Sequence, residues 1–176
     1  LLGKSSIVDV RLGDQVEREM TVLFSDIRDF TTLSETMSPA QTFAFINEFL
    51  SIMEPVCTRH NGFVDKYVGD GIMALFPTGA DDALAAAVGM VEELGRFNER
   101  RAEHGLPAVR VGIGLNSGLL MLGTVGGPDR MDGTVISDAV NLASRVEGLN
   151  RVFGTTILIS ERTYTHLRVA DRFDMR

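Results

Sequence analysis

The sequence predicts an α+β fold, in which a mixed β-sheet carries helices packed on one face. Three observations indicate this class. β-rich and helix-like segments alternate along the chain, two pairs of β-rich segments flank short turn sequences, and two helix-like segments follow the first strand directly. The 176 residues fit one domain with its own core, and they contain no internal repeat.

The first half of the chain is predicted to hold a strand, two helices and a hairpin. Residues 20–24 are apolar and β-branched, which is typical of a buried strand. Ser38 precedes Pro39, and this pairs an N-cap residue with proline at the first helical position. In order, the elements are a strand at 20–24 ending near Asp26, a short helix begun by Thr31 or Thr32, a long helix from Ser38 to residues 61–62, and strands at 63–68 and 72–76 around the turn 69–71.

The second half is predicted to alternate helices with short strands. Asn116, Ser117 and Gly118 are turn-forming residues, and we expect them to join the strands of a second hairpin. The whole order fits a ferredoxin-like, or palm-like, topology with the first strand central in the sheet. The elements are a helix from Asp81 or Asp82 to about residue 104, strands at 109–115 and 119–125, a loop at 126–129, a helix from Ser137 or Asp138 to about residue 149, a strand at 155–159 and a helix at 161–167.

The composition disfavours several classes of function. The net charge of −7, from 24 acidic and 17 basic residues, disfavours non-specific binding of nucleic acid. The single cysteine excludes an internal disulfide framework, and neither a membrane-length apolar run nor a signal peptide is visible. We therefore expect a cytoplasmic module. Residues 1–18 are expected to be a linker from an upstream sensor region, and residues 19–176 the folded domain.

Two aspartates stand where predicted strands end. Asp26 closes the first strand, and Asp70 lies in the turn of the first hairpin. Because these strands are neighbours in the predicted sheet, both carboxylates emerge at one edge, where such a pair can hold divalent cations that bind a triphosphate. From the residues alone, a helix-capping Asp26 and a turn-forming Asp70 remain alternative interpretations.

Three segments resemble the signature segments of class III nucleotidyl cyclases. They are FSDIRDFT at 24–31, KYVGDGIMALF at 66–76 and VNLASR at 140–145, and they occur in the order and at the spacing of that family. The likeness runs from about Glu19 to Ser160. It implies a cyclase homology domain that converts a nucleoside triphosphate to a 3′,5′-cyclic monophosphate and pyrophosphate.

The resemblance implies a role for each residue at a matching position. Asn141 and Arg145 lie four residues apart on one helix face, and without the resemblance they would be interpreted as surface residues, with Arg145 paired to Glu147 or solvated. The implied roles are binding of two Mg²⁺ or Mn²⁺ ions per site by Asp26, Asp70 and the carbonyl of Ile27, ribose orientation by Asn141, charge stabilisation on the transferred phosphoryl group by Arg145, and polyphosphate binding by Arg130.

Lys66 and Thr134 are the residues expected to select the base. The chain has 15 arginines but only two lysines, Lys4 and Lys66, although a solvated strand lysine remains the alternative. The resemblance implies that the Lys66 ammonium donates to adenine N1. Guanine carries a hydrogen on N1, so two donors would oppose each other and GTP would be rejected. The Thr134 hydroxyl can accept from the adenine amino group, and the lysine–threonine pair resembles the bicarbonate-responsive subclass.

The resemblance also implies that each site forms between two domains. Asp26 and Asp70 would come from one subunit, and Lys66, Thr134 and the α-helical pair Asn141 and Arg145 from the other. Because this chain carries both sets, we expect a symmetric homodimer with two composite sites for ATP. Rotation of one subunit against the other would give an upstream sensor a means of control.

Three features depart from the family pattern. Asp29 replaces a frequent glycine, Gly133 stands where an aromatic residue is usual, and the sequence stops at Arg176, before a segment that normally supplies a phosphate-binding lysine. The alternative function is therefore a catalytically silent cyclase-like module for nucleotide sensing or dimerisation. The glycines at 112, 114 and 118 have the wrong spacing for a dinucleotide fingerprint, and we attribute them to strand packing.

Overall fold

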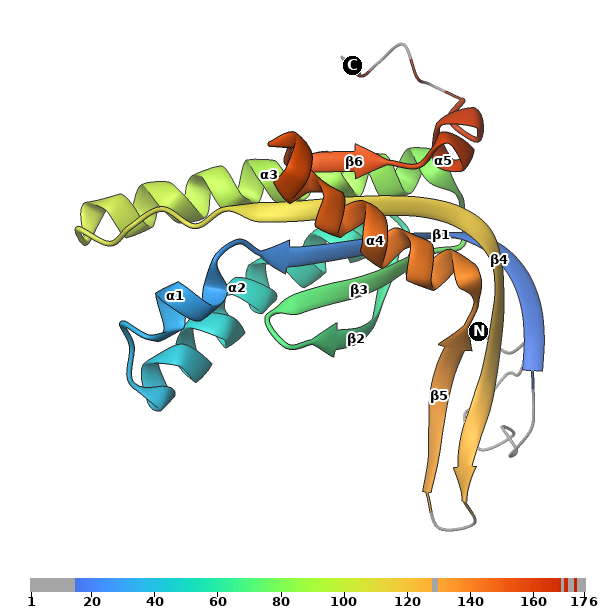
Figure 1. The fold of residues 1–176 in the computed structure, drawn as a ribbon, viewed down its shortest axis with the longest axis horizontal. Helices are drawn as coiled ribbons and strands as arrows, with labels where there is room; N and C mark the ends of the chain where they lie inside the picture. Colours follow the sequence, from blue (N-terminus) through green and yellow to red (C-terminus); the bar gives the residue numbers. More distant parts are fainter. Residues whose placement is uncertain (1–14, 128–129, 169, 171–172, 174–176) are drawn as a thin grey trace.

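The computed structural model describes residues 15–127, 130–168, 170 and 173 (Figure 1). Their strands form one sheet of six, ordered β2-β3-β1-β4-β5, with β6 pairing β4. Only the β4–β6 pair is parallel among the described pairs, so the predicted mixed sheet with a central first strand is confirmed. The strands are β1 (Gln15–Ile27), β2 (Phe63–Val68), β3 (Gly71–Phe76), β4 (Val111–Gly127), β5 (Arg130–Ile136) and β6 (Ile157–Ile159).

Helices lie on both faces of this sheet (Figure 1). The long helices α2 and α3 pack on one face as predicted, against a core that includes Leu23 and Ile113. The neighbouring strand residues point to the opposite face, because side chains alternate along a strand, and there Val22 and Leu120 pack with Ala143 of α4. The helices are α1 (Phe30–Ser34), α2 (Pro39–Arg59), α3 (Ala80–Glu103), α4 (Asp138–Phe153) and α5 (Glu161–Thr165).

The first residues of the helices show which local sequence signals determine where a helix begins. Ser38 caps α2 through a capping box with Gln41, and Ser137 caps α4, as predicted. The expectation that Thr31 or Thr32 caps α1 is wrong, since Asp29 occupies that position in a left-handed conformation without a side-chain cap. Helix α3 begins at Ala80, with Asp81 and Asp82 in its first turn.

The predicted second hairpin around residues 116–118 is wrong. β4 runs without a turn from Val111 to Gly127, and its pairing with β1 includes Asn116, Ser117 and Gly118. The outer part of β4 pairs instead with β5, which the sequence had not predicted as a strand. β4 bends along its length, so the β4–β5 hairpin extends away from the rest of the sheet (Figure 1). No helix in the described ranges combines the length and apolarity that crossing a membrane requires.

Candidate functional site

The structure brings the side chains of Asp26 and Asp70 together at one edge of the sheet. Asp26 lies near the end of β1, and Asp70 lies in the turn between β2 and β3. β1 and β3 pair antiparallel, with Ser25 opposite Ile72, so the turn reaches the end of β1. Gly71 permits this approach, because a Cβ atom there would lie 2.7 Å from the Ser25 carbonyl oxygen and 3.1 Å from Asp26 Oδ1.

Burial and a neighbouring charge perturb the Asp70 carboxyl group. Burial and the adjacent Asp26 carboxylate together raise the pKa of Asp70 to about 6, although backbone hydrogen bonds lower it. The Asp70 Oδ2 atom is buried without a hydrogen-bond partner. Two converging carboxylates with an unpartnered oxygen are a donor set that fits a divalent cation.

The site offers a cation two carboxylates rather than a complete cage. Within the described ranges, no cluster of three or more His, Cys, Asp or Glu side chains is placed to hold a metal ion. A carboxylate pair is nevertheless sufficient for Mg²⁺, which is commonly bound by one or two carboxylates together with substrate phosphates and water. The aspartates therefore fit ions that arrive with a triphosphate.

The backbone carbonyl of Ile27 is oriented by the next peptide group. The Arg28 N–H donates to the Arg110 carbonyl oxygen on the β4 side at 2.8 Å. In a trans peptide the C=O and N–H point in opposite directions, so the Ile27 carbonyl points away from β4. This direction is the one expected for a backbone ligand beside the aspartates.

Asp29, one of the departures from the family pattern, faces the end of α4. Its φ of 55° lies in the left-handed region that glycine adopts most easily. Its carboxylate lies 2.9 Å from Arg110 Nη2 and 3.6 Å from Arg151 Nη2. The additional negative charge beside the metal loop is therefore balanced by two arginines.

The predicted base-selecting residues lie on opposite edges of the sheet. Lys66 is on β2, where it is exposed and forms an ion pair with Asp65 at 3.2 Å. Thr134 is on β5, opposite Gly123, and three strands separate it from β2. The structure therefore does not show these two side chains in contact. The side chain of Arg130, predicted to bind the polyphosphate, and the surroundings of Gly133 lie outside the described residues.

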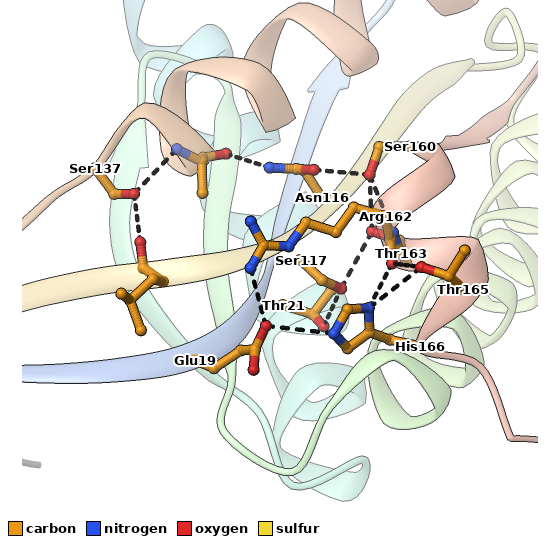
Figure 2. Close-up of polar contacts among 12 residues, drawn as sticks. Glu19, Thr21, Asn116, Ser117, Ser137, Ser160, Arg162, Thr163, Thr165 and His166 are labelled. Carbon is orange, nitrogen blue, oxygen red and sulfur yellow. Dashed lines mark hydrogen bonds and ion pairs between the residues drawn. The ribbon is translucent and has the colours of Figure 1, made fainter.

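Helix α4 presents Asn141 and Arg145 on successive turns, and both are exposed. Hydrogen bonds fix its first turn (Figure 2). The Ser137 hydroxyl accepts from the Ala139 N–H at 3.0 Å and donates to the Leu119 carbonyl oxygen at 2.6 Å. The Asn116 amide donates to the Ala139 carbonyl oxygen at 2.9 Å. The start of α4 is therefore attached to β4 by side-chain hydrogen bonds.

The contact between Arg28 and Glu147, near the site, was not predicted from the sequence. Glu147 on α4 forms an ion pair with Arg28, at 3.0 Å, rather than with Arg145. Burial raises the pKa of Glu147, the charges of Asp26 and Asp70 raise it further, and Arg28 lowers it. Arg28 follows the predicted metal ligands directly, but a sequence position alone does not show which helix its side chain contacts.

A cavity of about 620 Å³ lies next to Arg28, between α3, the start of β4 and the end of α4. Its lining includes Arg28, Arg110 and Arg151 but neither of the paired aspartates. Asp26 and Asp70 therefore lie outside this cavity, on another part of the surface.

Comparison with known proteins identifies the family. The family model for the adenylate and guanylate cyclase catalytic domain matches residues 13–176. An adenylate cyclase of Anabaena cylindrica is 43% identical over 181 residues, covering 100% of this chain and 36% of that protein. The chain thus spans about a third of that relative's length.

Solved structures give the same result. The adenylyl cyclase CyaB from P. aeruginosa superimposes with a TM-score of 0.77 at 31% identity, covering 86% of this chain and 81% of that one. The guanylyl cyclase Cya2 gives a TM-score of 0.76 at 33% identity, covering 85% and 78%. Together with the carboxylate pair where β1 ends and β3 begins, these similarities place the chain in the family of adenylate and guanylate cyclase catalytic domains.

Proposed function

We propose that this chain is the catalytic domain of an adenylate cyclase, which converts ATP to 3′,5′-cyclic AMP and pyrophosphate. The observation that carries the proposal is the convergence of Asp26 and Asp70, with a buried and unpartnered oxygen on Asp70. Groups that are costly to bury together and have no structural partner are typical of functional sites.

In the proposed mechanism, this chain's residues position the substrate. Asp26, Asp70 and the Ile27 carbonyl would hold two Mg²⁺ or Mn²⁺ ions. When bound, such ions neutralise triphosphate charge and activate the ribose 3′-hydroxyl. Asn141 would orient the ribose so that its 3′-oxygen faces the α-phosphorus, and Arg145 would place its guanidinium on the developing charge. Because the attack is intramolecular, correct orientation contributes much of the rate.

The choice of ATP over GTP depends on Lys66. The solved adenylyl and guanylyl cyclase structures match this chain at similar identity, 31% and 33%, so structural similarity does not select the base. The exposed Lys66 ammonium is a donor that suits adenine N1 and opposes the N1 hydrogen of guanine. Thr134 would accept from the adenine amino group, and Arg130 would contact the polyphosphate.

The proposal requires a homodimer, because the resemblance assigns Asp26 and Asp70 to one subunit and Lys66, Thr134, Asn141 and Arg145 to the other. The elements that carry the partner's proposed residues also expose large apolar side chains, which is typical of interfaces. These side chains are Tyr67 and Val68 on β2, Ile136 on β5 and Leu142 on α4. We propose that this surface meets a second copy, with residues 1–18 leading from an upstream sensor and the whole acting in the cytoplasm.

The decisive experiment measures product formation from ATP and from GTP, with Mg²⁺ or Mn²⁺, for the wild type and Asp70→Ala. We expect cyclic AMP from the wild type and a loss of at least about 100-fold in the variant. Equal turnover by Asp70→Ala would exclude the metal role. Nucleotide binding without product would favour a silent nucleotide-sensing module instead. Dilution through dissociation should lower the specific activity if the sites are composite.

Bicarbonate regulation is the finer part of the proposal, and it rests on the lysine–threonine pair alone. Titration of bicarbonate at fixed pH and ionic strength should raise the rate of cyclic AMP formation. A flat response would remove this regulation and leave the cyclase proposal intact.

A further inference from the structure

We propose that Arg28 and Glu147 are positioning residues, which hold the metal-binding loop after β1 at a fixed distance from α4. The inference rests on the proposed cyclase function. The loop presents Asp26 and the Ile27 carbonyl, and α4 presents Asn141 and Arg145. A single buried ion pair would therefore align the two surfaces that a subunit offers to its two composite sites.

The contact between Arg28 and Glu147 is close, double and largely buried. Arg28 Nη2 lies 3.0 Å from Glu147 Oε1, and the two side chains are 16% and 12% exposed. The same nitrogen donates to the main-chain carbonyl oxygen of Glu147 at 3.3 Å. Because the guanidinium binds both the side chain and the backbone of Glu147, it fixes the helix itself and not only a rotamer.

Two glycines in β4 provide the space for this pair. A Cβ atom at Gly112 would lie 1.7 Å from Arg28 Nη2 and 2.4 Å from Glu147 Oε1. A Cβ atom at Gly114 would lie 2.2 Å from the Glu147 backbone nitrogen. Gly112 is the residue directly opposite Asp26 in the β1–β4 ladder. The Arg28–Glu147 ion pair therefore lies against β4, beside a proposed metal ligand. Any side chain at position 112 would displace it.

Glu147 lies close enough to Asp26 and Asp70 for their charges to influence its carboxyl group. The charges of Asp26 and Asp70 both act on its carboxyl group, while Arg28 opposes them. An unneutralised carboxylate at this position would repel the aspartates when they ionise and would compete for an incoming cation. Arg28 thus balances the charge of the third acidic group near the pair.

The backbone of Arg28 is fixed as firmly as its side chain. Its N–H donates to the Arg110 carbonyl oxygen at 2.8 Å, which sets the direction of the Ile27 carbonyl. Its side chain then ties the same residue to α4. Loss of the guanidinium would leave the Arg28 N–H bonded to Arg110 but would free the loop to shift relative to Arg145.

The test compares Arg28→Met and Glu147→Gln with the double variant Arg28→Met/Glu147→Leu. Breaking one partner leaves a buried charge or donor unpaired, so the single variants are expected to unfold more easily, whereas an apolar pair can replace a buried ion pair without loss of stability. The control is Arg59→Ala, which removes an exposed pair with Glu93 (3.2 Å) on the α2–α3 surface.

Two readouts separate positioning from packing. We expect the double variant to melt near the wild-type temperature, to bind Mn²⁺ about 10-fold more weakly by calorimetry, and to lose about 10- to 100-fold in kcat with a smaller change in KM for ATP. The control should match the wild type in both. Wild-type Mn²⁺ affinity in the stable double variant would overturn the inference. An inactive wild type would refute the proposed function, while the Mn²⁺ titration, which needs no turnover, would still decide between positioning and packing.

Discussion

Two clusters of buried or half-buried polar side chains lie around the central strands β1 and β4, and they differ in how fully their polar atoms are paired. The carboxylate edge consists of Asp26, Asp70, Glu147 and Arg28. The hydroxyl–amide network consists of Thr21, Asn116, Ser117, Ser160 and Thr163 (Figure 2). In the network each named side chain has a polar partner, as in the Thr21–Ser117 contact at 2.8 Å and the Ser160 to Asn116 bond at 2.7 Å. At the carboxylate edge, Asp70 Oδ2 has none.

This difference in hydrogen bonding distinguishes a cluster that stabilises the fold from a cluster that is suited to bind a ligand. The network contains only neutral groups, and it joins β1, β4 and α5 to the start of α4 at no net electrostatic cost. At the carboxylate edge, burial and the like charge of Asp26 raise the pKa of Asp70, and the backbone hydrogen bonds there lower it only in part. Satisfied buried groups specify a fold, whereas unsatisfied charged groups are retained for a ligand. Variants of the two clusters should therefore fail in different ways.

The largest effect is expected from Asp26→Asn. The change keeps the size of the side chain but removes one carboxylate of the pair, so cyclase activity should fall at least about 100-fold and Mn²⁺ binding should weaken. Rates of cyclic AMP formation and Mn²⁺ calorimetry measure this. The matched control is Glu19→Gln on the same strand, an exposed residue paired with Arg162, which should keep wild-type activity. Full activity of Asp26→Asn would mean that the carboxylate edge has no metal role.

The second effect concerns stability rather than activity. Thr163→Val keeps the shape of a fully buried residue but removes two hydroxyl contacts, one with Ser117 and one with Ser160. The free energy of unfolding in urea should fall by about 1 to 3 kcal/mol. Thr165→Val, on the exposed side of the same helix, should change it by less than about 0.5 kcal/mol.

Activity tells whether the network is only structural. Cyclase activity per folded molecule should stay within about twofold of wild type in Thr163→Val, because the hydroxyl does not touch the proposed site. A loss comparable to that of Asp26→Asn would contradict the separation of the two clusters.

The same contrast explains how much of the molecule could be predicted from the sequence. Ser38 with Pro39 and the turn at 69–71 are local signals, and the helix and hairpin they predict are confirmed. Residues 116–118 carry an equally good turn signal, but long-range contacts override it. Asn116 bonds to Ala139 and Ser160, and a Cβ atom at Gly118 would lie 2.6 Å from the Ala139 Cβ atom. Helix packing, not a turn, requires that glycine.

The residues of the candidate site also fall into those that local sequence signals predict and those that only long-range contacts reveal. Asp26 and Asp70 were identifiable because each follows an apolar strand, and neighbouring strand ends meet at one edge. The Arg28–Glu147 pair was not, since it joins residues 119 positions apart through a gap that only the folded sheet creates. Asp29 was recognised as unusual, but its partners were not. Arg110 lies just before β4 and Arg151 lies on α4, and no local sequence pattern connects either residue to Asp29.

A smaller effect is expected from Asp70→Asn on stability without metal. The pKa of Asp70 is near 6 in the folded state and 3.8 ordinarily, so folding favours the protonated form. Stability contributed by Asp70 is thus fully present below pH 4 and is lost as pH rises towards 6. In EDTA at pH 7.5, Asp70→Asn should be more stable than wild type by about 1 kcal/mol, allowing for partial exposure, and equal to it at pH 4.

Added Mn²⁺ should reverse that order. The cation stabilises the state that binds it, so the wild type should gain stability at pH 7.5 while Asp70→Asn gains little. Thermal melting with and without Mn²⁺ measures both differences. A wild type that is the more stable protein in EDTA at pH 7.5 would show that the carboxylates are not in conflict.

The smallest effect is expected from Asp29→Gly. Two terms oppose each other: glycine relieves the left-handed strain, worth about 1 kcal/mol, and the ion pairs with Arg110 and Arg151 are lost. Those arginine side chains are 77% and 78% exposed, so the pairs contribute about 0 to 1 kcal/mol. The free energy of unfolding should therefore change by less than about 1 kcal/mol, and Mn²⁺ affinity by less than about threefold. A large loss of affinity would show that this exposed pairing, unlike other exposed pairs, belongs with the carboxylate edge.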